Sequence, residues 1–146
     1  MAAERRAEVT WSGNLLNGTG KIDFTGSGAI EGLDMTWASR SEPDEQGRTS
    51  PEELIAAAHA SCFSMALSHG LAQAGTPPDR LHVKATSTFV PGTGITNMKL
   101  DVTGRVEGMD EDAFRAAAET AKENCPVSKA MAGNVEIDVD AHLESA

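Results

Sequence analysis

The sequence predicts an α+β fold with two helices and about six strands, in a single domain over residues 1–146. Residues 1–50 are rich in Gly, Thr and Ser, and their short alternating segments between turn residues are typical of a β-meander. Residues 51–73 are almost continuously apolar and helix-forming. Residues 81–106 alternate again around a Pro-Gly turn, which predicts a β-hairpin.

The first strands are predicted in the segments "AEVTW", "KIDFTG" and "LDMTWASR". Asn17 and Gly18 predict the two-residue turn of a hairpin, which we prefer to a glycosylation acceptor or a phosphate-binding loop. Residues 41–50 are polar and contain Pro, Gly and several charges, so we expect a loop there.

The long helix has a complete start signal. Ser50 is the predicted N-cap, Pro51 the first helical residue and Glu53 the third, and Gly75 predicts the end of the helix near Gln73. The apolar run inside it, residues 54–67, is interrupted by His and Ser and is too short to span a bilayer, so we expect a core helix. A helix that is apolar nearly all round needs cover on more than one side, and a homodimer would supply that cover.

The second helix is predicted to begin at Asp110 as its N-cap. Apolar residues follow at helical spacing, and Cys125 continues their stripe: Phe114, Ala117, Ala118 and Ala121. Pro126 ends this helix, and "PVSKAMAG" predicts a further short helical turn. The alternating segment "VEIDVDAHL" predicts a final strand.

The charge of the chain bears on its partners and its compartment. A net charge of −10 and a pI near 4.7 disfavour nucleic acid and anionic membranes, because both bind positively charged surfaces. The first residues, "MAAERRAEVTWSGN", contain no apolar signal-peptide core, so we expect a cytoplasmic protein. In a reducing compartment the two cysteines are expected to be unpaired, or bridged only transiently.

Cys62 lies in the apolar stretch "HASCFSMALSHG". Apolar burial raises the pKa of a thiol unless a cation or hydrogen-bond donors compensate, so Cys62 alone should be inert. His59 lies three residues earlier on about the same helix face. These two side chains are too few for a closed metal site, and no other histidine has a fitting spacing, so we expect neither a metal nor a cofactor. From the residues alone, Cys62 is either a packed core residue or a nucleophile.

The segments "TSPEELIAAAHASCFSMALS" and "CPVSKAM" together resemble the OsmC/Ohr family of osmotically inducible and organic hydroperoxide resistance proteins. The resemblance implies an intertwined homodimer whose central long helices are covered by antiparallel β-sheets. It also implies a thiol-dependent peroxidase that reduces organic hydroperoxides. Cys62 would be the peroxidatic thiolate, Cys125 the resolving thiol that forms a disulfide with it, and a dithiol of the lipoyl type the reductant.

The family also uses a glutamate and an arginine at the thiolate. Its Pro-Glu-x-Leu motif matches Glu52, and ten residues separate Glu52 from Cys62, which is about 15 Å along a continuous helix. We therefore expect Glu52 to act across the dimer interface by orienting the arginine. Arg40, at the end of the strand-like "LDMTWASR", matches the arginine position of the OsmC branch, and Arg48 is its rival. A guanidinium suits this role because it stays charged when buried.

Two departures from the Ohr pattern favour the OsmC branch. Val127 replaces an aromatic residue inside Cys-Pro-x-Ser, and "WSGNLLNGTGK" stands where the Ohr branch has a Gly-Arg context. The alternative function is a non-catalytic dimeric protein of the same fold that binds a ligand or responds to redox state. A pairing of the two cysteines would argue against it.

The residues around the cysteines also have structural explanations. We expect His59 to be structural, and Ser128 to make a backbone hydrogen bond in the turn after Pro126. Phe63 and Met65 are expected in the core or in a pocket wall.

Overall fold

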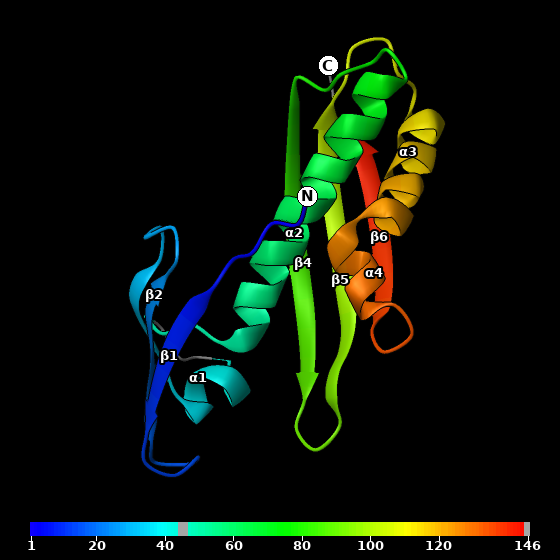
Figure 1. Cartoon of the computed structure of the whole chain (residues 1–146). Coiled ribbons are helices and arrows are strands. Elements are labelled where there is room, and N and C mark those ends of the chain that lie inside the picture. Colours follow the sequence, from blue (N-terminus) through cyan, green and yellow to red (C-terminus); the bar gives the residue numbers. More distant parts are fainter. Residues whose placement is uncertain (44–46, 145–146) are drawn as a thin grey trace. The chain divides into compact units, whose positions relative to one another are not determined.

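The structure is a computed structural model that describes residues 1–43 and 47–144. The chain divides into two compact units, Met1–Leu54 and Ile55–Ala146, with the long helix beginning in the first and continuing in the second (Figure 1). Part of the predicted loop at 41–50, residues 44–46, lies outside the described residues. The single domain over residues 1–146 stays a prediction.

The first unit contains an antiparallel sheet of three strands in the order β1 (Ala7–Ser12), β2 (Thr19–Thr25) and β3 (Glu31–Met35). The predicted two-residue Asn-Gly turn is wrong, because residues 13–18 connect β1 to β2. Asn14 organises this longer loop: its Oδ1 accepts the Asn17 N–H at 2.8 Å, and its carbonyl accepts the Gly18 N–H at 2.9 Å.

The predicted strand "LDMTWASR" ends early and turns into helix α1 (Trp37–Ser41). Thr36 is the N-cap of α1: its hydroxyl accepts the Ser39 N–H at 3.0 Å, while Ser39 Oγ accepts the Thr36 N–H at 2.8 Å. This reciprocal capping box satisfies two of the backbone donors at the start of the helix. Arg40 therefore projects from a helix and does not end a strand.

Helix α2 (Pro51–Gln73) begins and ends where the sequence predicts. Ser50 Oγ accepts the Glu53 N–H at 3.1 Å, as an N-cap does. Gly75, with φ of 85°, takes the left-handed conformation that closes the last turn and that a side chain would disfavour.

The cover of α2 differs from the prediction. The apolar run at residues 54–67, expected to be too short to span a bilayer, lies in a helix of 23 residues with an 18-residue window of mean hydropathy 1.3. By length and composition alone α2 could cross a membrane, so the length of the run does not exclude a span. Core helices of soluble proteins have the same length and composition. Only 22% of the window is buried: Phe63, Leu67 and Leu71 face the core of the second unit, whereas Met65 is 71% exposed. Within the described residues, other parts of the chain therefore cover only one side of α2.

The second unit contains a sheet in the order β4 (Arg80–Val90), β5 (Gly94–Arg105) and β6 (Glu136–Leu143). The β4–β5 hairpin turns at Pro91-Gly92 as predicted, with φ of 83° at the glycine. Strands β5 and β6 are parallel, so the expectation of antiparallel sheets is wrong for this pair. A parallel pair needs a crossover, which α3 (Glu111–Asn124) and α4 (Pro126–Met131) supply.

The core of the second unit lies between β5 and the helices. The alternate residues Met98, Leu100 and Val102 of β5 are buried, as the two-residue period of a strand requires. They share one cluster with the apolar faces of α2 and α3. The stripe predicted on α3 is confirmed, because Phe114, Ala118, Ala121 and Cys125 are all buried. Cys125 is thereby held inside the unit by the same stripe that anchors α3.

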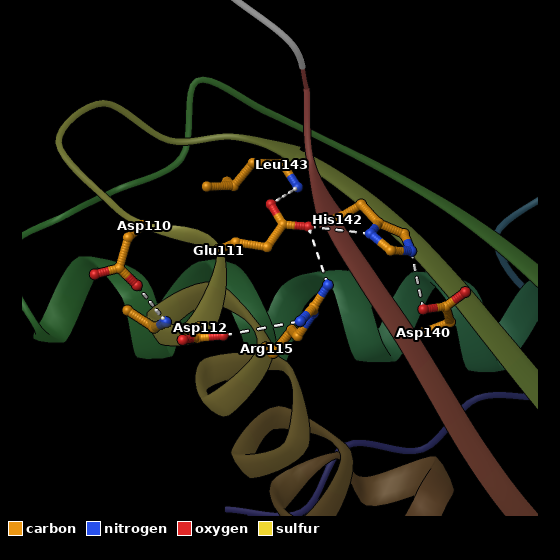
Figure 2. A network of polar contacts seen from close by, with 8 residues as sticks. Asp110, Glu111, Asp112, Arg115, Asp140, His142 and Leu143 are labelled. Atoms are coloured by element: carbon orange, nitrogen blue, oxygen red, sulfur yellow. Dashed lines mark hydrogen bonds and ion pairs between the residues drawn. The ribbon is translucent and has the colours of Figure 1, made fainter.

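A polar network joins the start of α3 to the end of β6 (Figure 2). Glu111 accepts the backbone N–H of Leu143 and a hydrogen bond from His142 Nδ1, each at 3.0 Å, and Arg115 lies 3.6 Å from the same carboxylate. These contacts, the Leu143 N–H first, lower the pKa of Glu111. Glu111 thus ties the crossover helix to the edge strand.

We expect Glu111→Gln to lower the melting temperature at neutral pH but not in acid. Because the pKa of Glu111 is lowered in the folded state, its contribution to stability is present above the unfolded value of about 4.3 and is lost as pH falls through the folded pKa. Asp112→Asn is the matched control. It removes a charge from the same helical turn, but the Asp112 side chain is 96% exposed. Melting curves from pH 3 to 7 measure this, and a deficit of Glu111→Gln that persists at pH 3 would contradict it.

Candidate active site

The two cysteines come from different elements of the second unit. Cys62 lies on α2 and is partly exposed, whereas Cys125 is fully buried at the junction of α3 and α4, and both are free thiols. The Cys125 backbone is held from both sides: its N–H donates to Ala121 at 2.9 Å, and its carbonyl accepts the Lys129 N–H at 3.0 Å. Pro126 at the first position of α4 creates this junction, because it cannot continue α3.

The structure brings these two thiols together. The Cys125 side chain is close enough to Cys62 that both its hydrogen bonding and its charge raise the pKa of Cys62, in addition to the larger effect of burial. The effect of burial agrees with the expectation that apolar surroundings raise the pKa of this thiol. Two neighbouring thiols on separate elements are suited to form a disulfide that can be reduced again.

One group opposes the rise in the pKa of Cys62. The backbone N–H of Val127, in the first turn of α4, lowers it by hydrogen bonding. Sequence reasoning missed this donor, although Pro126 implied it: the first N–H groups of a helix have no partner within the helix, so they remain available to a neighbouring anion.

His59 and Ser128 form a second connection between α2 and α4. Their side chains are buried, and His59 Nε2 lies 2.7 Å from Ser128 Oγ. The expected backbone bond of the Ser128 side chain is therefore replaced by a bond to a histidine 69 positions earlier in the chain. Burial lowers the pKa of His59, so its imidazole is neutral near pH 7.

Arg40 and Glu52 are paired within the first unit. Glu52 Oε1 accepts the Arg40 Nε–H at 2.9 Å and lies 2.9 Å from a second guanidinium nitrogen. The Glu52 side chain is 8% exposed and that of Arg40 34% exposed. The second carboxylate oxygen, Oε2, is buried and has no hydrogen-bond partner among the described residues. Arg40 and Glu52 thus form an ion pair within one chain, while their predicted action on Cys62 across a dimer interface stays a prediction.

The remaining candidates lie elsewhere. Arg48, the rival arginine, lines a polar hollow of the first unit with Asp34 and Thr36. As expected, Phe63 belongs to the core, and Met65 is exposed and lines a hollow with Ser68 and His69. Within residues 1–43 and 47–144, no group of three or more His, Cys, Asp or Glu side chains is arranged to hold a metal ion.

Comparison with known proteins gives matches over nearly the whole chain. Residues 43–140 match the sequence profile of the OsmC family, described as OsmC-like protein. The chain is 36% identical to the peroxiredoxin OsmC of Escherichia coli (strain K12) over 148 residues, which cover 99% of this chain and 100% of that protein. It is 28% identical to the organic hydroperoxide resistance protein OhrB of Bacillus subtilis (strain 168) over 131 residues, 88% of each chain.

The fold is also similar to solved structures. The crystal structure of the organic hydroperoxide resistance protein OhrB of Bacillus subtilis matches with a TM-score of 0.66 and 25% identity, covering 93% of this chain and 97% of that one. An OsmC protein from Legionella pneumophila matches with a TM-score of 0.63 and 23% identity, covering 96% and 97%. The mixed α+β architecture with two sheets is therefore shared with these structures.

Proposed function

Because this chain belongs to the OsmC family, we propose that it is a thiol-dependent peroxidase that reduces organic hydroperoxides to alcohols. The observation that carries the proposal is the juxtaposition of Cys62, partly exposed on α2, and Cys125, buried beside it at the α3–α4 junction. The names of the relatives, a peroxiredoxin and organic hydroperoxide resistance proteins, point to the same reaction class.

In the proposed first step, the Cys62 thiolate attacks the terminal oxygen of the hydroperoxide. The O–O bond breaks, the released alkoxide takes up a proton to become an alcohol, and Cys62 becomes a sulfenic acid. The apolar residues around Cys62 favour an alkyl hydroperoxide over hydrogen peroxide, because an organic substituent gains from leaving water.

In the second step, the Cys125 thiolate attacks the sulfur of the Cys62 sulfenic acid. A disulfide forms and the oxygen leaves as water, which protects Cys62 from further oxidation to sulfinic acid. A dithiol, of the lipoyl type in the family, then reduces the disulfide by two successive exchanges and becomes a disulfide itself. The balance is one hydroperoxide and one dithiol consumed, with one alcohol, one water and one oxidised dithiol formed.

The first step needs a thiolate, yet burial and Cys125 both raise the pKa of Cys62. The Val127 N–H compensates in part. We assign the remaining stabilisation to the Arg40 guanidinium, held by Glu52 and acting on the Cys62 of the other subunit. A cation beside a thiolate lowers the thiol pKa, and arginine remains charged in such a place.

The homodimer belongs to this proposal. Large apolar side chains are exposed in both units, among them Met65 on α2 and, in the first unit, Val9, Trp11, Leu15, Leu16, Phe24 and Leu33. A second copy would bury them, and burial of such a surface drives stable association. We propose a cytoplasmic dimer in which α2 is a core helix. Sedimentation of protein prepared without detergent tests the dimer and the core position of α2. A monomer mass would contradict the dimer, and recovery of the protein only with membranes would contradict the core helix.

Hydroperoxide consumption by the native protein tests the proposed function. With a dithiol as reductant, we expect turnover of cumene hydroperoxide with a kcat/KM at least about tenfold above that for hydrogen peroxide, the factor that about 1.4 kcal/mol of apolar transfer gives. Dihydrolipoamide and a monothiol are compared as reductants, because the proposed reductant is a dithiol of the lipoyl type. No turnover of either peroxide would favour the alternative, a non-catalytic binding protein of the same fold.

A further inference from the structure

The buried contact between His59 and Ser128 is not used by any chemical step above. His59 is fully buried, its Nε2 is bonded to Ser128 Oγ at 2.7 Å, and its Nδ1 has no hydrogen-bond partner among the described residues. Burying an imidazole with one ring nitrogen unsatisfied is unfavourable relative to an apolar side chain. The hydrogen bond to Ser128 is therefore the contact that offsets part of this cost and gives a reason for a histidine at position 59.

The contact lies one helical turn from the thiols. His59 and Cys62 are three residues apart on one face of α2, while Ser128 follows Val127 directly in the first turn of α4. Adjacent positions of α4 thus act on α2: the Val127 N–H lowers the pKa of Cys62, and Ser128 Oγ is bonded to His59. Two adjacent contacts define both the position and the rotation of a short helix, whereas one defines only its position.

Helix α4 is anchored at its start by the buried Cys125 but has no side-chain cap there. It has six residues, and its N-cap, Cys125, makes no side-chain capping bond. Ser128, at the third position, turns its hydroxyl toward α2 and so supplies across helices the restraint that a capping side chain supplies locally.

We propose that the His59–Ser128 hydrogen bond sets the position of the Cys125–Pro126 junction and of the Val127 N–H against Cys62, which makes His59 and Ser128 positioning residues for the two-cysteine reaction. The inference rests on the proposed function for its catalytic meaning. Its geometric content, the placement of α4 against Cys62, does not depend on any peroxide.

The first test is the pH dependence of Cys62 alkylation by iodoacetamide in a Cys125→Ser background. Ser128→Ala is expected to move the midpoint upward by about half a unit to one unit, because the Val127 N–H is no longer held against the thiolate. Ser128→Thr retains the hydroxyl and should keep the native midpoint. Ser64→Ala is the matched control, since Ser64 Oγ bonds Ala60 of its own helix at 2.7 Å.

Substitutions of His59 probe the same bond from the other side. In His59→Gln the amide reaches the place of Nε2 and can still bond Ser128, whereas in His59→Asn it stands near the place of Nδ1 and cannot. We expect His59→Gln to keep the native alkylation midpoint and His59→Asn to behave as Ser128→Ala. If Ser128→Ala does not fold, this pair decides the question, and equal midpoints in the two variants would overturn the inference.

The second test follows the sulfur products in chains that keep both cysteines. With a few equivalents of cumene hydroperoxide and no reductant, Ser128→Ala is expected to raise the ratio of sulfinic acid to disulfide about fivefold to tenfold, the range that the loss of one buried hydrogen bond corresponds to. If native protein does not react with hydroperoxide, the proposed function fails while the alkylation midpoints still test the placement. A reactive native protein whose Ser128→Ala variant keeps both the native midpoint and the native product ratio would overturn this inference alone.

Discussion

Cys62→Ser is expected to lower the rate of organic hydroperoxide consumption at least about a thousandfold. A serine hydroxyl is not ionised at neutral pH and is a far weaker nucleophile toward peroxide oxygen than a thiolate, so no sulfenic acid forms. The change replaces only the sulfur of a partly exposed side chain by oxygen, and the melting temperature should stay close to native. Dithiol-coupled peroxide loss measures the rate.

Cys125→Ser should separate the two steps. Because the Cys125 thiol raises the pKa of Cys62, its removal does not slow the attack on peroxide, and a first equivalent is still consumed. Without the resolving thiol, excess peroxide converts Cys62 to sulfinic acid, which adds about 32 Da to the intact chain. The native chain instead loses about 2 Da as the disulfide forms.

The two variants together make the assignment specific. Turnover that survives in Cys62→Ser, or a reaction in which Cys125 gains the oxygens, would reverse the roles of the cysteines. Multiple turnovers by Cys125→Ser at the native rate, with no sulfinic acid, would show that the dithiol reduces the sulfenic acid directly and that Cys125 is a core residue.

Local signals explain which parts of the fold the sequence predicted well. Ser50, Pro51 and Gly75 mark the ends of α2 because their side chains, or the lack of one, act on backbone groups a few residues away. Helix α1 was missed although Thr36 and Ser39 carry a capping signal, because the segment before it alternates as a strand does. The parallel pairing of β5 and β6 was missed because a crossover, not a local turn, decides which strands become neighbours.

The same distinction holds for the site. The buried stripe on α3 predicted that Cys125 faces the core, but its closeness to Cys62 follows only when α2 and α3 pack on one sheet. The Val127 N–H and the His59–Ser128 bond are tertiary contacts between helices that 50 or more residues separate. Pro126 marks the helix start that makes the Val127 N–H available, but no residue pattern indicated that this N–H would face Cys62 or that His59 would meet Ser128.

Arg40→Met is expected to lower kcat/KM for organic hydroperoxide about a hundredfold at pH 7, as the loss of one electrostatic stabiliser does. Without the guanidinium the pKa of Cys62 rises further, so the deficit should shrink as pH increases and more thiolate forms.

Arg40→Met also leaves the buried Glu52 carboxylate without its partner, which destabilises the fold. The double variant with Glu52→Gln removes that charge and should show the same loss of rate with a higher melting temperature. Arg48→Met is the matched control and should stay within about twofold of native.

Co-expression of Arg40→Met with Cys62→Ser decides which subunit supplies the arginine. In a mixed dimer, an intact Arg40 from the Cys62→Ser chain would face the intact Cys62 of the other chain, so random pairing would restore roughly a quarter of native activity. If the arginine served the cysteine of its own chain, no combination of these two chains would hold a complete site and activity would stay at the level of the single variants. Because each chain alone is nearly inactive, a recovered quarter would require both the dimer and the action of Arg40 across its interface.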